Sequence, residues 1–225
     1  MSENPVSLVV TIDGPAGAGK STVARMLAAR LDFEFLDTGA MYRCVTLAVL
    51  RAGISLSNAN RIAALAETLE IEVNGTEVRM NGEDVSEAIR RPKVASAIGL
   101  VADNVDVRET LSDLQRRWTQ GRRVVTEGRD QGSEVFPTSP CKIFLVASPE
   151  ERAKRRKKEL TGRGIEMTYE QVLAQQLQRD SDDRSRPVGA LRKAEDAIEF
   201  STDGLPLEEV VDQLVKLVND RIAGS

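Results

Sequence analysis

The residues best suited to chemistry begin with a glycine-rich phosphate-binding motif. Residues 14–21 read Gly-Pro-Ala-Gly-Ala-Gly-Lys-Ser and match the pattern G-x-x-x-x-G-K-[ST]. In this motif backbone N–H groups curl around an anion at a helix N-terminus. A predicted strand over Val6–Ile12 precedes the motif and a predicted helix over Thr22–Leu31 follows it, which is the context the loop requires. We therefore expect Lys20 to reach the outer phosphates of a ligand and the Ser21 hydroxyl to coordinate Mg²⁺.

A second polar cluster, residues 127–132, reads Glu-Gly-Arg-Asp-Gln-Gly and follows a predicted core strand at Val124–Thr126. Ligands of open α/β sheets bind beyond the carboxyl ends of the strands. The Arg129-Asp130 pair, set between glycines, is therefore well placed to meet a ligand. The alternative is a surface turn closed by a local ion pair.

A third cluster, residues 37–43, follows the predicted strand Phe33–Leu36. Thr38 is expected to cap the helix that begins there, because hydroxyl side chains accept hydrogen bonds from the first free N–H groups of a helix. Arg43 lies one turn further on, and spacing alone leaves open whether it meets a phosphate.

Two charged segments lie in the second half of the chain. Residues 150–163 carry seven basic and three acidic residues, and glycines follow at 162 and 164. Such a run is usually a solvated helix face, but a basic helix with glycine joints also suits a lid over polyphosphate, in which at least one arginine would be catalytic. Residues 179–186 alternate in charge: either they form a self-satisfied ion-pair network, or Arg179 and Asp183 act as an i, i+4 pair.

Composition narrows the class of protein. The chain has 225 residues, a net charge of −4, no histidine and two cysteines. The length suits one domain, and the acidic balance argues against a nucleic-acid partner. The sequence contains no apolar run of the roughly 18 residues that a membrane span needs. We expect a reduced, cytoplasmic enzyme that works without an imidazole base.

The order of the predicted elements indicates an α/β fold with a parallel sheet. Helical patterns cover 40–52 and 58–70, and Ser57 is the predicted cap of the second. The alternation of strands and helices is interrupted at 71–85. There Asn74-Gly75 and Asn81-Gly82 are turn signals, which predict a small β insertion. Further strands at 143–146 and 197–200 alternate with helices at 107–118, 150–160 and 169–178, and a closing helix begins at Pro206.

The sequence resembles the bacterial cytidylate (CMP) kinases, a branch of the nucleoside monophosphate kinases, over nearly its whole length. The phosphate-binding loop is shared by many families, and the combination of the other pieces is more selective. The matching pieces are Ile12–Thr22, Leu36–Arg43, Gly128–Asp130, Val135–Pro137, Ser148–Arg152 and the cluster of Arg179, Asp183 and Arg186.

The resemblance implies a P-loop, three-layer α/β fold with a five-stranded parallel sheet in a single domain. Its core would span about 1–37, 106–150 and 168–225, its monophosphate-binding subdomain with a β insertion about 38–105, and its lid about 151–167. It also implies transfer of the ATP γ-phosphoryl group to CMP or dCMP with Mg²⁺, in a protein that is a monomer.

The resemblance also assigns residues to roles. ATP would be held by the motif residues Gly14, Pro15, Ala16, Gly17, Ala18, Gly19, Lys20, Ser21 and Thr22. Arg43 and Arg129 would hold the acceptor phosphate, Arg179 and Asp183 the sugar hydroxyls, and Thr38, Arg108, Asp130 and Arg186 the base. The catalytic set would be Lys20, Arg129, Arg156 and Arg186.

Four positions depart from the family pattern. Glu127 stands where Asp is usual beside Mg²⁺, and Gln131 replaces an aliphatic residue. Ala190-Leu191 stands where Pro-Leu is common. Gly99 occupies a place where Ser is frequent, so the preference between ribose and deoxyribose stays open.

Two rival functions stay open. One is a kinase on the same core that phosphorylates a sugar, a shikimate-like acid or another nucleotide; a hydroxyl acceptor would need a carboxylate base, and Asp37 could serve. The other is a nucleotide-dependent switch, which the lack of an Asn-Lys-x-Asp sequence disfavours.

The motif itself generates a first prediction. Lys20→Ala should abolish turnover while the fold is retained, because the ammonium that neutralises the outer phosphates is lost. Steady-state rates measure the loss of turnover, and circular dichroism on the same preparation measures whether the fold is retained. Normal rates in the variant would remove the phosphate-binding assignment.

Overall fold

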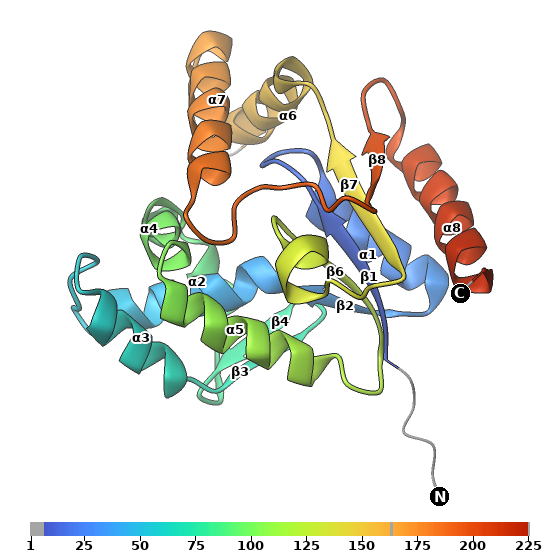
Figure 1. Ribbon diagram of the computed structural model, residues 1–225. Coiled ribbons are helices and arrows are strands. Elements are labelled where there is room, and N and C mark those ends of the chain that lie inside the picture. Colours follow the sequence, from blue (N-terminus) through green and yellow to red (C-terminus); the bar gives the residue numbers. More distant parts are fainter. Residues whose placement is uncertain (1–6, 163, 225) are drawn as a thin grey trace, which may run out of the picture.

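The computed structural model describes residues 7–162 and 164–224 (Figure 1). Val6, the predicted start of the first strand, and Arg163 of the basic segment lie outside the described residues. Five strands form a parallel sheet in the order β2-β6-β1-β7-β8. Their bounds are β1 Leu8–Asp13, β2 Glu34–Asp37, β6 Arg123–Gly128, β7 Cys141–Val146 and β8 Ile198–Ser201. The predicted five-stranded parallel sheet is confirmed.

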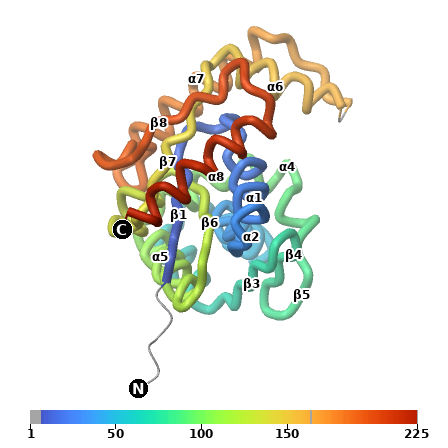
Figure 2. The backbone as a smooth tube through the Cα atoms, turned by 90° about the vertical axis from the view of Figure 1, so that its right-hand side faces the viewer, coloured from blue at the N-terminus to red at the C-terminus, as the bar shows by residue number. Residues whose placement is uncertain are grey.

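Helices α1 (Lys20–Leu31) and α8 (Leu207–Ala223) cover one face of this sheet. Apolar side chains from both helices and from the central strands form one continuous buried core, which includes Ile12, Leu27 and Leu214. Figure 2 shows α1 and α8 side by side. On the other face, Val135 and Phe136, in and after the π-helical turn η2 (Gln131–Val135), pack against Val9. Apolar side chains therefore pack against both faces of β1.

A second buried apolar core lies beside the edge strand β2; it is formed mainly by the chain between β2 and β6, together with Leu36 of β2 and Val124 of β6. Its helices are α2 (Thr38–Arg51), α3 (Ala59–Glu67), α4 (Pro92–Ala102) and α5 (Val105–Trp118), with a short 3₁₀ turn η1 (Ala88–Arg90). Strands β3 (Ile71–Asn74), β4 (Glu77–Met80) and β5 (Glu83–Asp84) form an antiparallel sheet of their own. The turns predicted at Asn74-Gly75 and Asn81-Gly82 join them, which confirms the β insertion.

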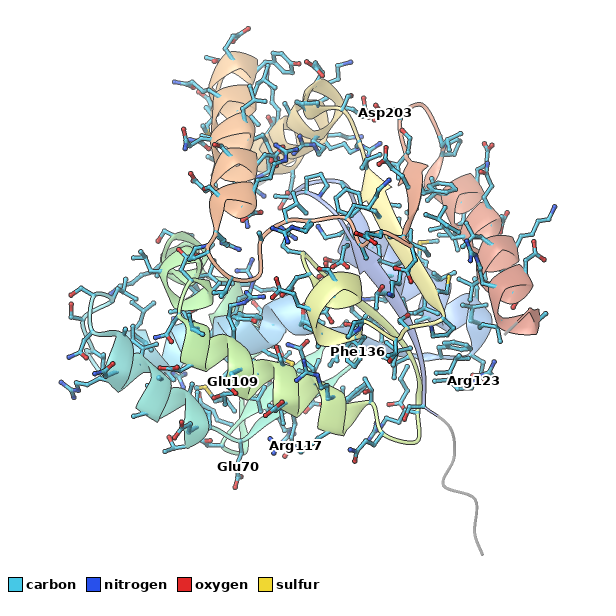
Figure 3. The ribbon with its side chains drawn as sticks, viewed as in Figure 1. Glu70, Glu109, Arg117, Arg123, Phe136 and Asp203 are labelled. Atoms are coloured by element: carbon cyan, nitrogen blue, oxygen red, sulfur yellow. The ribbon has the colours of Figure 1, made fainter. Side chains whose placement is uncertain are left out.

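Helices α6 (Pro149–Gly162) and α7 (Tyr169–Ser185) form a pair above the carboxyl ends of the strands (Figure 1). Ala153, Leu160 and Val172 are the buried apolar contacts between them. Asp203, labelled in Figure 3 just after β8, accepts hydrogen bonds from the Ser148 N–H at 3.0 Å and so fixes the start of α6. No helix among the described residues is long and apolar enough to cross a bilayer.

Two predicted helix caps are wrong by one residue. Asp37, not Thr38, caps α2 by accepting the Ala40 N–H at 2.9 Å, and Asn58, not Ser57, caps α3. Both are Asx residues that immediately adjoin the predicted hydroxyl caps. Pro206 likewise lies at the cap of α8 and not in its first turn.

Candidate active site

The parallel sheet brings three chemistry-bearing loops to one edge. Register pairs Asp13 with Gly128 and Asp37 with Glu127, so β1, β2 and β6 end side by side. Gly14 begins the phosphate-binding loop where β7 approaches closely: a Cβ there would lie 2.0 Å from the Leu145 carbonyl oxygen. In Figure 3, Arg123 marks the opposite end of the sheet. The sequence clusters after these strands therefore share one site.

Lys20 is the first residue of α1, at the end of the loop, and is buried. Its Nζ donates to the Pro15 carbonyl oxygen at 2.8 Å, which holds the ammonium across the loop. Burial, and then repulsion from Arg129, lowers the pKa of Lys20 to about 7. An anion in the loop would favour the charged form and raise that pKa again.

Ser21 contacts a carboxylate from β6. Its hydroxyl donates to Glu127 Oε1 at 2.9 Å, so the longer side chain in place of the usual Asp still reaches it. The Glu127 carbonyl oxygen accepts the Thr38 hydroxyl at 2.6 Å. Burial, and then the nearby Glu127 carboxylate, raises the pKa of Asp37. Two carboxylates and a hydroxyl thus gather beside the loop, and hard oxygen ligands are what Mg²⁺ prefers.

The described residues contain no group of three His, Cys, Asp or Glu side chains that could hold a metal ion. A magnesium ion here would depend on Ser21, the neighbouring carboxylates and the phosphate oxygens of the ligand. That donor set fits Mg²⁺, which is commonly held through one or two carboxylates and substrate phosphates.

Asp13 joins the phosphate-binding loop to the turn that carries Arg129 and Asp130. Its carboxylate accepts the backbone N–H groups of Gln131 at 2.8 Å and Gly132 at 2.7 Å. Burial raises its pKa to about 7. Sequence reasoning did not single out this residue, although its place directly before Gly14 was a signal that could have found it.

Asp183 on α7 gathers two arginines. It accepts Arg129 Nε at 2.8 Å and Arg186 Nη2 at 3.1 Å. Burial alone would raise the pKa of Asp183, but Arg129 and Arg186 outweigh it and hold the pKa below its usual value. Arg186 Nε also pairs with Asp103 at 2.9 Å, which links the end of α7 to the end of α4.

Of the two alternatives for residues 179–186, the i, i+4 ion pair between Arg179 and Asp183 does not form among the described residues; Asp183 pairs with Arg129 and with Arg186 instead. Arg179 is exposed at the surface, and its pKa is lowered by partial desolvation from the surrounding protein and then by repulsion from Arg129. Both arginines therefore lie in one strongly positive region above the loop.

Arg108 and Asp130 form a buried ion pair between α5 and the turn after β6. The Arg108 guanidinium also lies 5.6 Å from the centre of the Tyr42 ring and donates to the Ala102 carbonyl oxygen at 3.3 Å. Gly189, with a φ of +62°, packs directly on it: a Cβ would fall 1.8 Å from Arg108 Cζ. The pair is thus a donor and an acceptor held side by side.

Arg43 and Arg156 stand apart from this pair. Arg43 is half-buried on α2 and donates to the Ile89 carbonyl oxygen at 3.4 Å, and burial lowers its pKa. Arg156 is exposed on α6 and pairs with Glu159 at 2.6 Å. The contacts of Arg156 do not join it to the Asp183 cluster.

Arg152 differs from the solvated helix face expected for its segment. It is 2% exposed and pairs with buried Asp180 at 2.6 Å. Helical spacing turns this one position of α6 toward the loop and α7, whereas Lys154 and Lys157 face solvent. Charge composition could not reveal this, because the partner lies 28 residues away.

Fold and motif together define a P-loop kinase: a parallel sheet, a glycine-rich loop with its lysine, and a cluster of arginines above the strand ends. A family model described as "Cytidylate kinase" matches residues 10–220. The chain belongs to the cytidylate kinase family. The family identified from the sequence is thereby confirmed.

Curated relatives agree over nearly their full lengths. The chain is 49% identical to "Cytidylate kinase" of Rhodopirellula baltica, covering 97% of this chain and 95% of that protein. It is 47% identical to "Cytidylate kinase" of Carboxydothermus hydrogenoformans, covering 93% and 96%. A solved structure of an uncharacterized protein from Eubacterium ventriosum is similar in fold alone, with a TM-score of 0.54, 11% identity and coverage of 96% and 99%.

The lowered pKa of Lys20 generates a second prediction. At pH 8.5 the Lys20 amine is largely neutral, because its pKa is about 7, and a bound polyphosphate restores the proton. Binding of ADP with Mg²⁺ should therefore take up close to one proton. Calorimetry in buffers of different ionisation enthalpy measures that number.

The matched control is Lys20→Arg, whose guanidinium stays protonated at this pH. This variant should take up few protons when it binds ADP with Mg²⁺. Any proton that Asp13 takes up is common to both proteins and is removed when the two measurements are subtracted. Buffer-independent heats in the unaltered protein, or equal uptake in the control, would contradict the assignment to Lys20.

Proposed function

We propose that this protein transfers the γ-phosphoryl group of ATP to CMP and dCMP, giving ADP with CDP or dCDP. The observation that carries the proposal is the buried Arg108–Asp130 pair, which stands beside an arginine cluster at the same sheet edge as the phosphate-binding loop. Membership of the cytidylate kinase family supports it. Kinases of this family use ATP, so the loop at residues 14–22 is assigned to ATP.

The chemistry needs no general base. The acceptor is a phosphate monoester with a second pKa of about 6, so at neutral pH it is largely a dianion and already a nucleophile. This explains how a chain without histidine can do the work. Catalysis then consists of in-line positioning and neutralisation of charge on the transferred group.

Lys20 and the loop amides would hold the ATP phosphates, and Arg43 and Arg129 the acceptor phosphate. Mg²⁺, when bound, would neutralise charge on the β- and γ-phosphates, and Ser21 would be its ligand beside Glu127. Arg129 and Arg186 offer planar forks that suit phosphate oxygens. Arg156, which is exposed on α6, is proposed to reach the transferred group when the lid closes.

The Arg108–Asp130 pair has the polarity that cytosine requires. Asp130 can accept a hydrogen bond from the N4 amino group, while Arg108 or Arg186 donates to N3 or O2. Thr38 would border the base. Uracil would present its O4 acceptor to the carboxylate and leave buried groups unpaired, which can cost several powers of ten in selectivity.

We propose further that Arg179 and Asp183 meet the sugar. Gly99 has open space around its Cβ position, so the fold does not demand glycine there. The proposed division of the single domain keeps 38–105 as the monophosphate-binding subdomain and 151–167 as the lid. The protein is proposed to act as a monomer in the cytoplasm, where ATP and CMP are available. It is proposed to have no nucleic-acid or membrane partner.

The direct test of the function is ADP release with ATP and Mg²⁺ across CMP, dCMP, UMP, AMP and shikimate. CMP and dCMP should be converted with kcat/KM at least about 100-fold above that for UMP, because the mismatch leaves buried polar groups unpaired. Brisk turnover of shikimate or AMP with CMP untouched would instead establish a different kinase. Slow hydrolysis without any acceptor dependence would indicate a nucleotide switch.

A substitution tests the base-reading role. Asp130→Ala should lower the ratio of kcat/KM for CMP to that for UMP by about tenfold or more, because the N4 acceptor is removed. Glu109→Ala, which removes an exposed carboxylate from the surface of α5, is the matched control. Thermal unfolding of both variants separates loss of fold from loss of selectivity. Unchanged discrimination in folded Asp130→Ala would reject the role.

A further inference from the structure

Among the described residues, Arg152 has the largest of the nearly fully buried side chains, and the proposed reaction does not yet use it. It lies in the first turns of α6 and is 2% exposed, and its partner Asp180 on α7 is equally buried. Nη1 and Nη2 meet the two carboxylate oxygens of Asp180 at 3.0 and 2.6 Å. Nε donates to the Ala147 carbonyl oxygen at 3.0 Å. All three nitrogens of the guanidinium are therefore engaged inside the protein.

The fourth contact of Arg152 reaches the phosphate-binding loop. Nη1 donates to the Ala16 carbonyl oxygen at 3.0 Å, across 136 positions of the chain. A peptide unit is planar and trans, so its C=O and N–H point in opposite directions. Fixing the Ala16 carbonyl toward Arg152 therefore directs the Gly17 N–H to the other side of the loop, where its anion-binding N–H groups converge.

The packing around Gly17 shows that the loop tip rests on α6 and α7. Gly17 has a φ of +79°, and a Cβ there would lie 3.0 Å from Gln176 Nε2 and 3.5 Å from Arg152 Cβ. A buried ion pair adds little net stability compared with apolar residues of the same size. What a forked guanidinium provides instead is fixed geometry between several acceptors.

We propose that Arg152 is a positioning residue for the ATP phosphates: it aims the Gly17 N–H at them and ties the loop to α7 through Asp180. This rests on the proposed ATP site at the loop. The same helix carries Arg179 and Asp183, the residues assigned to the acceptor. Arg152 thus sets the place of the donor phosphates relative to the helix that receives the acceptor, a role separate from that of the exposed lid arginine Arg156.

The test removes both charges together, so that neither is left buried and unpaired. The double variant Arg152→Met/Asp180→Leu is expected to fold with a cooperative melting transition, since apolar replacement of a buried pair is often neutral. Its KM for ATP and its Kd for ADP with Mg²⁺ should rise about tenfold or more, and its kcat should fall, because a misplaced amide loses aligned contacts. Its Kd for CMP alone should change less than about threefold, because the CMP-binding residues contact neither substituted side chain.

Lys154→Met is the matched control, because it removes an exposed positive charge two positions along the same helix. It should keep both nucleotide affinities. If the double variant lacks a cooperative transition, Arg152→Lys takes its place: it keeps a charge for Asp180 but cannot fork to Ala16, and the same rise in KM for ATP is expected.

A folded variant with an unaltered KM for ATP and kcat would overturn the proposal and leave Arg152 a structural residue. An equal loss of ADP and CMP affinity would also overturn it, since general distortion would then explain both. Failure of the unaltered protein to bind ADP would instead refute the ATP site itself.

Discussion

Repulsion between like charges is the constraint on which the rest of this structure depends. Two phosphorylated nucleotides meeting end to end bring together about five or six negative charges, and the cleft that receives them must be correspondingly basic. Arginines so close together also repel one another, and buried carboxylates offset this repulsion. Asp183 pairs with Arg129 and Arg186, Asp130 pairs with Arg108, and Asp180 pairs with Arg152. Each carboxylate fixes the position of a guanidinium and limits the cost of burying it.

The parallel sheet makes this concentration of charge possible. Because β1, β2 and β6 run in the same direction, their final residues and the loops that follow lie at one edge, although more than a hundred residues separate Asp13 from Gly128. Asp13 then holds the turn after β6 against the start of the phosphate-binding loop. The α6–α7 pair closes the arrangement from above, anchored by Asp203 at its base and by Arg152 at its centre.

Much of this could be predicted from local patterns. The glycine motif, the strand periodicity and the Asn-Gly turns are encoded within a few neighbouring residues, and they predicted the α/β fold and the β insertion. What could not be predicted was the choice of partner. Helical spacing indicated Arg179 as a partner of Asp183, but in the structure Asp183 pairs with Arg129, which lies 54 residues away in the sequence. Arg152 carries the same charge as its exposed neighbours, and only the packing of three distant elements distinguishes it. The sequence also left open the geometry around Glu127, and the structure shows that its carboxylate accepts a hydrogen bond from Ser21.

The most direct test of the account is a crystal structure with CMP, Mg²⁺ and a non-hydrolysable ATP analogue. We predict that Arg129 leaves Asp183 for the CMP phosphate, that Asp183 turns to the ribose, and that cytosine N4 lies against Asp130. The hydrogen bond between Arg152 and the Ala16 carbonyl oxygen should be kept. A complex in which the Arg129–Asp183 pair stays closed, with the CMP phosphate held away from the arginine cluster, would contradict it.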